Sequence, residues 1–231
     1  MKNTLIISDT HFPYQHQDTF LFLAAIKKKY KIQIVKHTGD MIDNHSSSFH
    51  EVEYGTMSAK EEHEMALVAV QKLYKMFPKM SVIIGNHSSM TFRKAKSAGI
   101  PLDHLKSYND VYGTPGWNWT DKDFFDINKD EQCLLIHSMS TNTGNNAAKH
   151  SFNSVQGHHH SKFGIEYFAD CAMLRWSMTC GCLIDMNHPA FNYASGATIN
   201  RPVIGCGAII NDHPILIPMR LNANGRWDKH L

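Results

Sequence analysis

Five short motifs, which occur in a fixed order along the chain, carry the side chains best suited to binding divalent metal ions. They are Asp9-Thr10-His11, Gly39-Asp40, Gly85-Asn86-His87, His137 and Gly157-His158-His159-His160. Carboxylate, imidazole and amide ligands suit manganese, iron, zinc or nickel better than calcium. No thiolate accompanies them, which disfavours a tightly held tetrahedral zinc. The set is large enough for two ions that share a carboxylate.

Four of the motifs follow, at once or within a few residues, a short apolar run that is typical of a buried β-strand. These runs are residues 5–7, 32–35, 82–84 and 134–136. Ligands of open α/β sheets bind beyond the carboxyl ends of the strands. Taken singly, a Gly-Asp pair is an ordinary turn and a histidine is an ordinary surface residue. All five motifs in this order favour one common site.

The order and spacing of the motifs resemble the calcineurin-like metallophosphoesterase superfamily, whose pattern is D-x-H, G-D, G-N-H-[D/E], H and G-H-x-H. The resemblance extends from Leu5 to about Met219. Within the superfamily, the chain looks most similar to a compact phage and bacterial group that is often labelled DNA-repair exonuclease-like. The stretches that carry this closer resemblance are SDTHFPY (8–14), NNAAKH (145–150), CGCLID (180–185) and NHP (187–189).

The expected structure is a single α/β domain over residues 1–231, a length that one hydrophobic core can serve. The resemblance implies a four-layer αββα sandwich of two mixed β-sheets flanked by helices. Apolar residues at helical spacing predict helices over residues 18–30 and 59–77. Residues 90–119 are expected to contain short, broken helices. Further strands are predicted at 124–127, 133–137, 163–168, 172–179, 201–210 and 214–219.

The resemblance implies two divalent metal ions, with Mn²⁺ favoured and Fe, Zn, Ni or Mg as alternatives. Carried over motif by motif, the first ion would be held by Asp9, His11, Asp40 and His160. Asp40 would bridge to the second ion, which Asn86, His137 and His158 would hold. His159 is expected to point away from the site. The implied activity is that of a metal-dependent phosphoric ester hydrolase, in which a hydroxide that bridges the metals attacks the phosphorus.

His87 and Asp40 are the predicted catalytic residues, with His87 as the general acid that protonates the leaving oxygen. The alternative role for His87 is to support the metal ligands. The chain departs from the family pattern directly after this residue, because Ser88 stands where an acidic residue is usual. That acidic residue would orient the histidine and raise its pKa. Asp43 or Asp103 are the two candidates to replace it.

The resemblance favours phosphodiesters as substrates, with nucleotides and nucleic acids among them. The alternatives are a phosphomonoesterase that acts on a phosphoprotein or nucleotide, and a non-catalytic scaffold of the same fold. Candidate substrate-binding residues are Asn44, His45, Arg93 and Lys149. Residues 90–119 also hold Lys94, Lys96, Trp117 and Trp119. The two indoles are interpreted either as a surface on which bases stack or as a hydrophobic plug.

Composition supports an ordinary globular protein with 42% hydrophobic and 19% charged residues. A net charge of +2 is too small to indicate a nucleic-acid binder by itself. The five cysteines form no CxxC pair and are odd in number, which favours reduced thiols. No apolar run has the length of a membrane span. We therefore expect a cytoplasmic protein, either a phage protein in the host cytoplasm or a bacterial cytosolic one, whose sequence specifies no oligomeric state.

Overall fold

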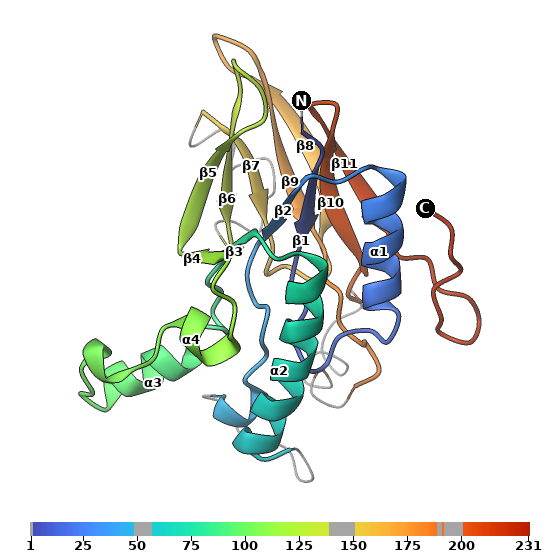
Figure 1. Ribbon diagram of the computed structural model, residues 1–231. Coiled ribbons are helices and arrows are strands. Elements are labelled where there is room, and N and C mark those ends of the chain that lie inside the picture. Colours follow the sequence, from blue (N-terminus) through green and yellow to red (C-terminus); the bar gives the residue numbers. More distant parts are fainter. Residues whose placement is uncertain (1, 49–56, 139–150, 189–190, 192–200) are drawn as a thin grey trace.

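The structure is a computed structural model that describes residues 2–48, 57–138, 151–188, 191 and 201–231. Its strands form two mixed β-sheets that pack face to face (Figure 1). The six-stranded sheet has the order β11 (His213–Pro218), β10 (Gly205–Ile210), β1 (Thr4–Ile7), β2 (Ile34–His37), β3 (Met80–Ile83) and β4 (Trp117–Thr120). Strands β1 to β4 are parallel to one another. Strand β10 is antiparallel to β1, and β11 is antiparallel to β10.

The five-stranded sheet has the order β5 (Lys122–Asp126), β6 (Gln132–Ile136), β7 (Asn153–Gln156), β9 (Leu174–Cys180) and β8 (Phe163–Ala169). Its three central strands are parallel, and both edge strands are antiparallel to their neighbours. The parallel strands of both sheets therefore place their carboxyl ends where ligand-bearing loops can meet.

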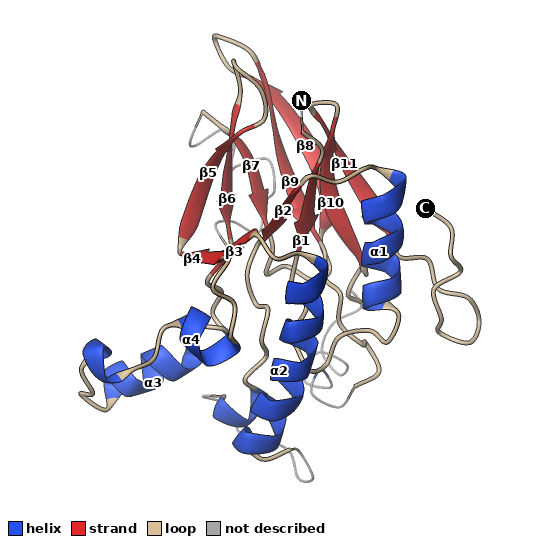
Figure 2. Cartoon of the chain, in the orientation of Figure 1, coloured by secondary structure: helices blue, strands red, loops and turns tan. Residues whose placement is uncertain are grey.

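The described α-helices all precede β4 in the chain (Figure 2). Helices α1 (Thr19–Lys29) and α2 (Ala59–Met76) pack on the outer face of the six-stranded sheet. A capping box between Ser58 and Glu61 fixes the start of α2. Helices α3 (Met90–Ser97) and α4 (Tyr108–Tyr112) lie beyond β4, and the 3₁₀ turns are η1 (His45–Ser47) and η2 (Leu102–His104). No helix in the described ranges is long and apolar enough to cross a membrane.

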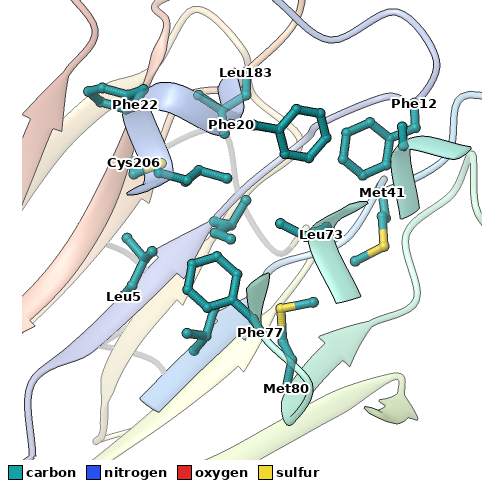
Figure 3. Packing of buried hydrophobic residues seen from close by; sticks show 14 of the residues in the cluster. Leu5, Phe12, Phe20, Phe22, Met41, Leu73, Phe77, Met80, Leu183 and Cys206 are labelled. Atoms are coloured by element: carbon teal, nitrogen blue, oxygen red, sulfur yellow. The ribbon is translucent and has the colours of Figure 1, made fainter. Parts of the chain in front are cut away.

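Strand β1 is buried on both faces, which explains its continuous apolar sequence. Leu5 and Ile7 point toward the helices and belong to the larger core cluster. Ile6, between them, belongs to the smaller cluster between the two sheets. Figure 3 shows this larger cluster, which contains Leu5 of β1, Phe22 of α1 and Leu73 of α2. The fold therefore holds the strand that leads to the first motif rigidly in place.

The predicted architecture, two mixed sheets flanked by helices, is confirmed. Strand β7 is absent from the sequence prediction, because Val155 is its one strongly apolar residue. The strand is nevertheless buried along its whole length, since its polar side chains pair across the sheet. Ser154 Oγ lies 2.9 Å from Ser177 Oγ, and Gln156 Nε2 donates to Thr179 Oγ1 at 3.2 Å.

Candidate metal centre

The loops that follow the parallel strands converge at the carboxyl edges of the two sheets. The loops after β1 and β2 run side by side, because Asp9 N donates to Gly39 O at 3.2 Å and His11 N donates to Asp40 O at 3.0 Å. At the end of the five-stranded sheet, Gly157 N donates to His137 O at 3.0 Å. Backbone hydrogen bonds thus fix the loops that carry the predicted ligands.

Six of the predicted ligands form two groups of potential ligand atoms, and the atoms in each group lie within 4.8 Å of one another. The groups are Asp9, His11 and His160, and Asp40, His137 and His158. The seventh predicted ligand joins the second group, since Asn86 Oδ1 lies 2.9 Å from His137 Nε2. His159 is in neither group. Two groups of this composition fit two borderline divalent ions.

In the first group, two imidazole nitrogens face each other beside a carboxylate. His11 Nε2 lies 3.1 Å from His160 Nε2, and the latter lies 3.4 Å from Asp9 Oδ1. The other ring nitrogen of His11, Nδ1, lies 2.5 Å from Asp43 Oδ1. A proton on Nδ1 that is donated to this carboxylate leaves the Nε2 lone pair free for a metal ion. The first group is therefore built as a ligand set.

In the second group, a hydrogen bond to a backbone carbonyl orients the histidine in the same way. His137 Nδ1 lies 3.1 Å from Thr38 O, so that Nε2, which lies 3.0 Å from Asp40 Oδ2, is free to bind a metal ion. The second oxygen of Asp40, Oδ1, accepts from His87 N at 2.8 Å. Asp40 therefore organises the motif around His87 and still presents an oxygen to the second group.

The backbone at the ligands is held in the left-handed region. The φ angles of Asp9, His11 and Asp40 are 45°, 45° and 46°, a conformation that costs a residue with a side chain about 1 kcal/mol or more. Two motif glycines are required by close approach: an added Cβ at Gly85 would lie 2.1 Å from Asp40 Oδ1, and one at Gly157 would lie 2.4 Å from Asp9 Oδ2. The glycines of the motifs therefore make room for the carboxylates.

The charges of the two groups depend on one another. Burial opposes ionisation of Asp9, but hydrogen bonds with His11 and His160 hold its pKa well below the usual range. Burial alone would lower the pKa of His11, yet the carboxylates of Asp43 and Asp9 raise it to about 10. Burial likewise opposes a raised pKa at His137, but Asp40 raises it. The carboxylates are therefore ionised and attract positive charge into the site.

His87 lies outside these two groups, but it forms a third group with His11 and Asp43, whose potential ligand atoms also lie within 4.8 Å of one another. Its Nδ1 lies 2.8 Å from Asp43 O and 3.4 Å from Asp43 Oδ1, and its ring packs edge-on against His11 at 4.7 Å between centroids. Burial and the neighbouring His11 lower the pKa of His87. Of the two candidate carboxylates, Asp43 contacts the ring, whereas Asp103 is an exposed residue of η2. Asp43 thus contacts both His11 and His87.

The candidate substrate residues have different surroundings. Asn44 Nδ2 donates to His87 O at 2.9 Å, and His45 follows it on η1. Arg93 is exposed on α3. Lys149 lies outside the described residues. Glu62 was not among the predicted site residues, although its buried carboxylate accepts from His45 N at 2.6 Å; its one signal in the sequence is an acidic residue on the inner face of the helix predicted over 59–77.

The two indoles between residues 90 and 119 form a plug. Trp117 is 3% exposed and donates from Nε1 to Phe77 O at 2.8 Å. Trp119 stacks on Tyr108 with 4.7 Å between ring centroids and 14° between their planes. Trp117 is therefore a core residue that cannot stack on a base, and Trp119 supports the ring of Tyr108.

The structure is similar to solved structures along nearly its whole length. A phosphoesterase from E. coli, Yfce, aligns with a TM-score of 0.53 and 14% sequence identity over 94% of this chain and 92% of that one. Vacuolar protein sorting 29 from Cryptosporidium parvum aligns with a TM-score of 0.47 and 14% identity over 93% and 95%. At these identities the similarity shows the fold alone. No curated protein matches the sequence.

The sequence also matches a family model. The model of the calcineurin-like phosphoesterases covers residues 2–181. This span includes every predicted metal ligand and both the strands and the loops that position them. The chain therefore belongs to the calcineurin-like phosphoesterase family.

Proposed function

We propose that the protein is a dinuclear-metal-dependent phosphoesterase that favours phosphodiesters, with nucleotides and nucleic acids among its substrates. The observation that carries the proposal is the pair of ligand groups, Asp9, His11 and His160 on one side and Asp40, His137 and His158 on the other, in which the carboxylates, His11 and His137 are buried. Carboxylates and imidazoles whose ligand atoms gather at the carboxyl edges of two sheets are suited to metal binding rather than to structural support.

The two groups and Asn86 would hold the two ions, and Asp40, which lies in the second group, would bridge them as the family pattern implies. When bound, a pair of divalent ions supplies an acidified water as nucleophile and neutralises charge on the phosphate oxygens. Manganese remains the favoured metal of the proposal. The amide oxygen of Asn86 adds no negative charge, so it leaves the site able to accept an anionic phosphate.

The proton for the leaving oxygen would come from His87. One of its ring nitrogens, Nδ1, faces Asp43, which leaves Nε2 to face the substrate. Asp43 holds the ring in place and partly replaces the acidic residue that the family usually has at position 88. Because the pKa of His87 is lowered, its protonated form would be scarce near neutral pH. Substrates with good leaving groups, which need no proton, should therefore be cleaved best.

The preference for diesters, the nuclease-like activity and the assignment to a cytoplasmic phage or bacterial protein rest on the resemblance of the sequence motifs. They remain parts of the proposal. The second candidate, a phosphomonoesterase, is compatible with the same ligand groups. The third, a non-catalytic scaffold, is disfavoured because a complete ligand set would have no use in it.

Hydrolysis of bis(p-nitrophenyl) phosphate and of p-nitrophenyl phosphate, each with added Mn²⁺, separates these candidates. We expect faster turnover of the diester, and turnover of single- or double-stranded oligonucleotides in the same panel. Faster turnover of the monoester would favour the second candidate. Binding of two ions without turnover of any substrate would favour the scaffold and contradict the proposed activity.

A further inference from the structure

A cavity of about 240 Å³ lies between α2, α3 and α4, next to the metal centre. This aromatic cavity is lined on one side by the rings of Phe92, Tyr108 and Tyr112, and on the other by the polar residues Asn44 and Ser88. Its volume is below the 300–1,000 Å³ or so that is usual for whole drug-sized ligands. It therefore suits a single ring system that belongs to a larger substrate.

The cavity and the metal centre share a wall. Asn44 lines the cavity and donates from Nδ2 to His87 O at 2.9 Å. Ser88, the next residue after His87, is among the residues that line the cavity, and its backbone nitrogen lies 3.5 Å from Asp40 Oδ1. A group in the cavity would therefore be separated from the candidate ligands by one residue of the chain. This spacing suits a substituent of the phosphate bound at the metals.

The aromatic wall is fixed from behind. The rings of Phe92 and Tyr108 lie 4.8 Å apart between centroids, and Tyr108 stacks on Trp119 at 4.7 Å. Tyr108 also donates from its hydroxyl to Ser88 O at 3.2 Å. Because these contacts hold the rings before a ligand arrives, little conformational entropy is lost when a flat group binds against them.

The polar wall contains a hydroxyl group with nothing to bind. Ser88 is 2% exposed, and its Oγ has no hydrogen-bond partner among the residues that the structure describes. Buried polar groups without a partner are rare and costly, and they often occur where function requires them. A ring with a polar edge would supply the missing partner, whereas a phenyl ring would leave the hydroxyl unpaired.

We propose that the aromatic cavity is a subsite for a nucleobase of the substrate, which stacks on the Tyr108 wall and hydrogen-bonds with Ser88 Oγ. The proposal rests on the proposed phosphoesterase activity and names its substrate class, an ester of a nucleotide. The exposed Lys106 at the rim adds a positive charge near the path of a phosphate backbone. A phosphotyrosine side chain is the competing occupant, and the unpaired Ser88 hydroxyl argues against it.

Two esters with the same leaving group test the subsite: thymidine 5′-(p-nitrophenyl phosphate) and methyl p-nitrophenyl phosphate, each with Mn²⁺. Stacking of one base corresponds to about 5- to 150-fold in binding. We therefore expect kcat/KM to be higher for the thymidine ester by a factor in this range. Equal values for the two esters would overturn the proposal.

Thr91→Trp tests the location, because Thr91 is an exposed residue of α3 that lines the cavity, so a bulky ring at this position would fill it. Ser97→Trp, on the exposed end of the same helix, is the matched control. We expect Thr91→Trp to abolish the preference for the thymidine ester and Ser97→Trp to retain it. Retention of the preference in both variants would overturn the location.

Ser88→Ala tests the polar contact. Removal of an unpaired buried hydroxyl should leave the Tm equal or raise it, while the preference for the thymidine ester falls. A lower Tm would show that the hydroxyl is satisfied inside the protein and would contradict the proposal. Ser97→Ala is the matched control for the loss of a hydroxyl.

Binding of thymidine to metal-free protein, measured by NMR titration, separates the subsite from the activity. Saturable binding that Thr91→Trp removes supports the subsite even if neither ester is hydrolysed, in which case the proposed activity alone is wrong. Absence of thymidine binding together with hydrolysis of both esters would overturn the subsite alone. Stronger binding of a phosphotyrosine peptide than of thymidine monophosphate would also overturn it.

Discussion

The protein buries carboxylates in two different ways. Asp18, at the start of α1, is paired with a permanent cation: Arg226 Nε donates to its Oδ2 at 2.8 Å and Arg226 Nη2 to its Oδ1 at 2.5 Å. Asp9, Asp40 and Asp43 lie at the metal centre, and their ion-pair partners in the described part of the chain are histidines. The first carboxylate faces a cation whose charge is permanent, whereas the other three face imidazoles whose charge depends on protonation.

This difference indicates what the metal centre lacks. Three buried carboxylates within one cluster of imidazoles carry a negative charge that histidines neutralise only when they are protonated. Divalent cations can replace those protons and bind the same atoms. The Asp18–Arg226 pair therefore serves stability, whereas the metal centre is arranged to be completed by ions from outside.

Asp40→Asn should have the largest effect, because it removes the carboxylate that is proposed to bridge both ions. We expect activity on every ester to be abolished and metal content to fall, as measured by turnover and elemental analysis. Asp103→Asn, on the exposed turn η2, is the matched control and should leave both unchanged. Full activity with two metals per chain in Asp40→Asn would contradict the two-metal assignment.

His87→Asn should leave the metal content intact and lower kcat by about 10²–10⁴-fold on substrates with poor leaving groups. The loss on nitrophenyl esters should be much smaller, since nitrophenolate leaves without a proton. The matched control is His104→Asn on η2. Equal losses on both kinds of substrate would exclude His87 as the general acid.

Replacement of Arg93 and Lys94 by alanine should raise KM for an oligonucleotide several-fold and much more than KM for a small diester. Both residues lie exposed on α3, next to the aromatic cavity, where cations would meet phosphates. The effect should shrink as the salt concentration rises. A double variant at the exposed Lys28 and Lys79 is the control. A similar change for both substrates would show that α3 makes no nucleic-acid contact.

Asp18→Asn should lower stability with no change in metal content. The Arg226 guanidinium lowers the pKa of Asp18 to about 2. Because the pKa of Asp18 in the folded state lies below its unfolded value, the ion pair stabilises the folded protein above about pH 4. This stabilisation is lost as the pH falls through about 2. We expect the free energy of unfolding to fall by about 1 kcal/mol at neutral pH. The loss is no larger because the Arg226 side chain is half exposed and solvent screens the pair. Thermal unfolding from pH 2 to 7 measures it.

The sequence allowed much of the metal centre to be predicted, because its ligands follow apolar runs that can only be buried strands. His137 comes directly after such a run, Asp9 follows one with a single residue between, and Asp40 is the third residue after the end of β2; the structure brings all three to the same site. Only the structure explains why glycine occupies positions 85 and 157: at both positions a side chain would collide with a carboxylate of the site.

Other parts could not be predicted, because their signals are not local. Strand β7 is polar, and pairing across the sheet rather than an apolar pattern buries it. The choice of Asp43 over Asp103 depends on where two loops lie in space. The aromatic cavity requires three helices to meet, and no spacing in the sequence encodes that arrangement.

The central claim is that the two groups of ligands each hold one divalent ion, and the number of Mn²⁺ ions bound per chain tests it most directly. Isothermal titration with Mn²⁺, followed by anomalous diffraction at the manganese edge, gives both the number and the positions. The account predicts two ions per chain, one beside Asp9, His11 and His160 and one beside Asp40, His137 and His158. One ion, none, or ions bound elsewhere would contradict it.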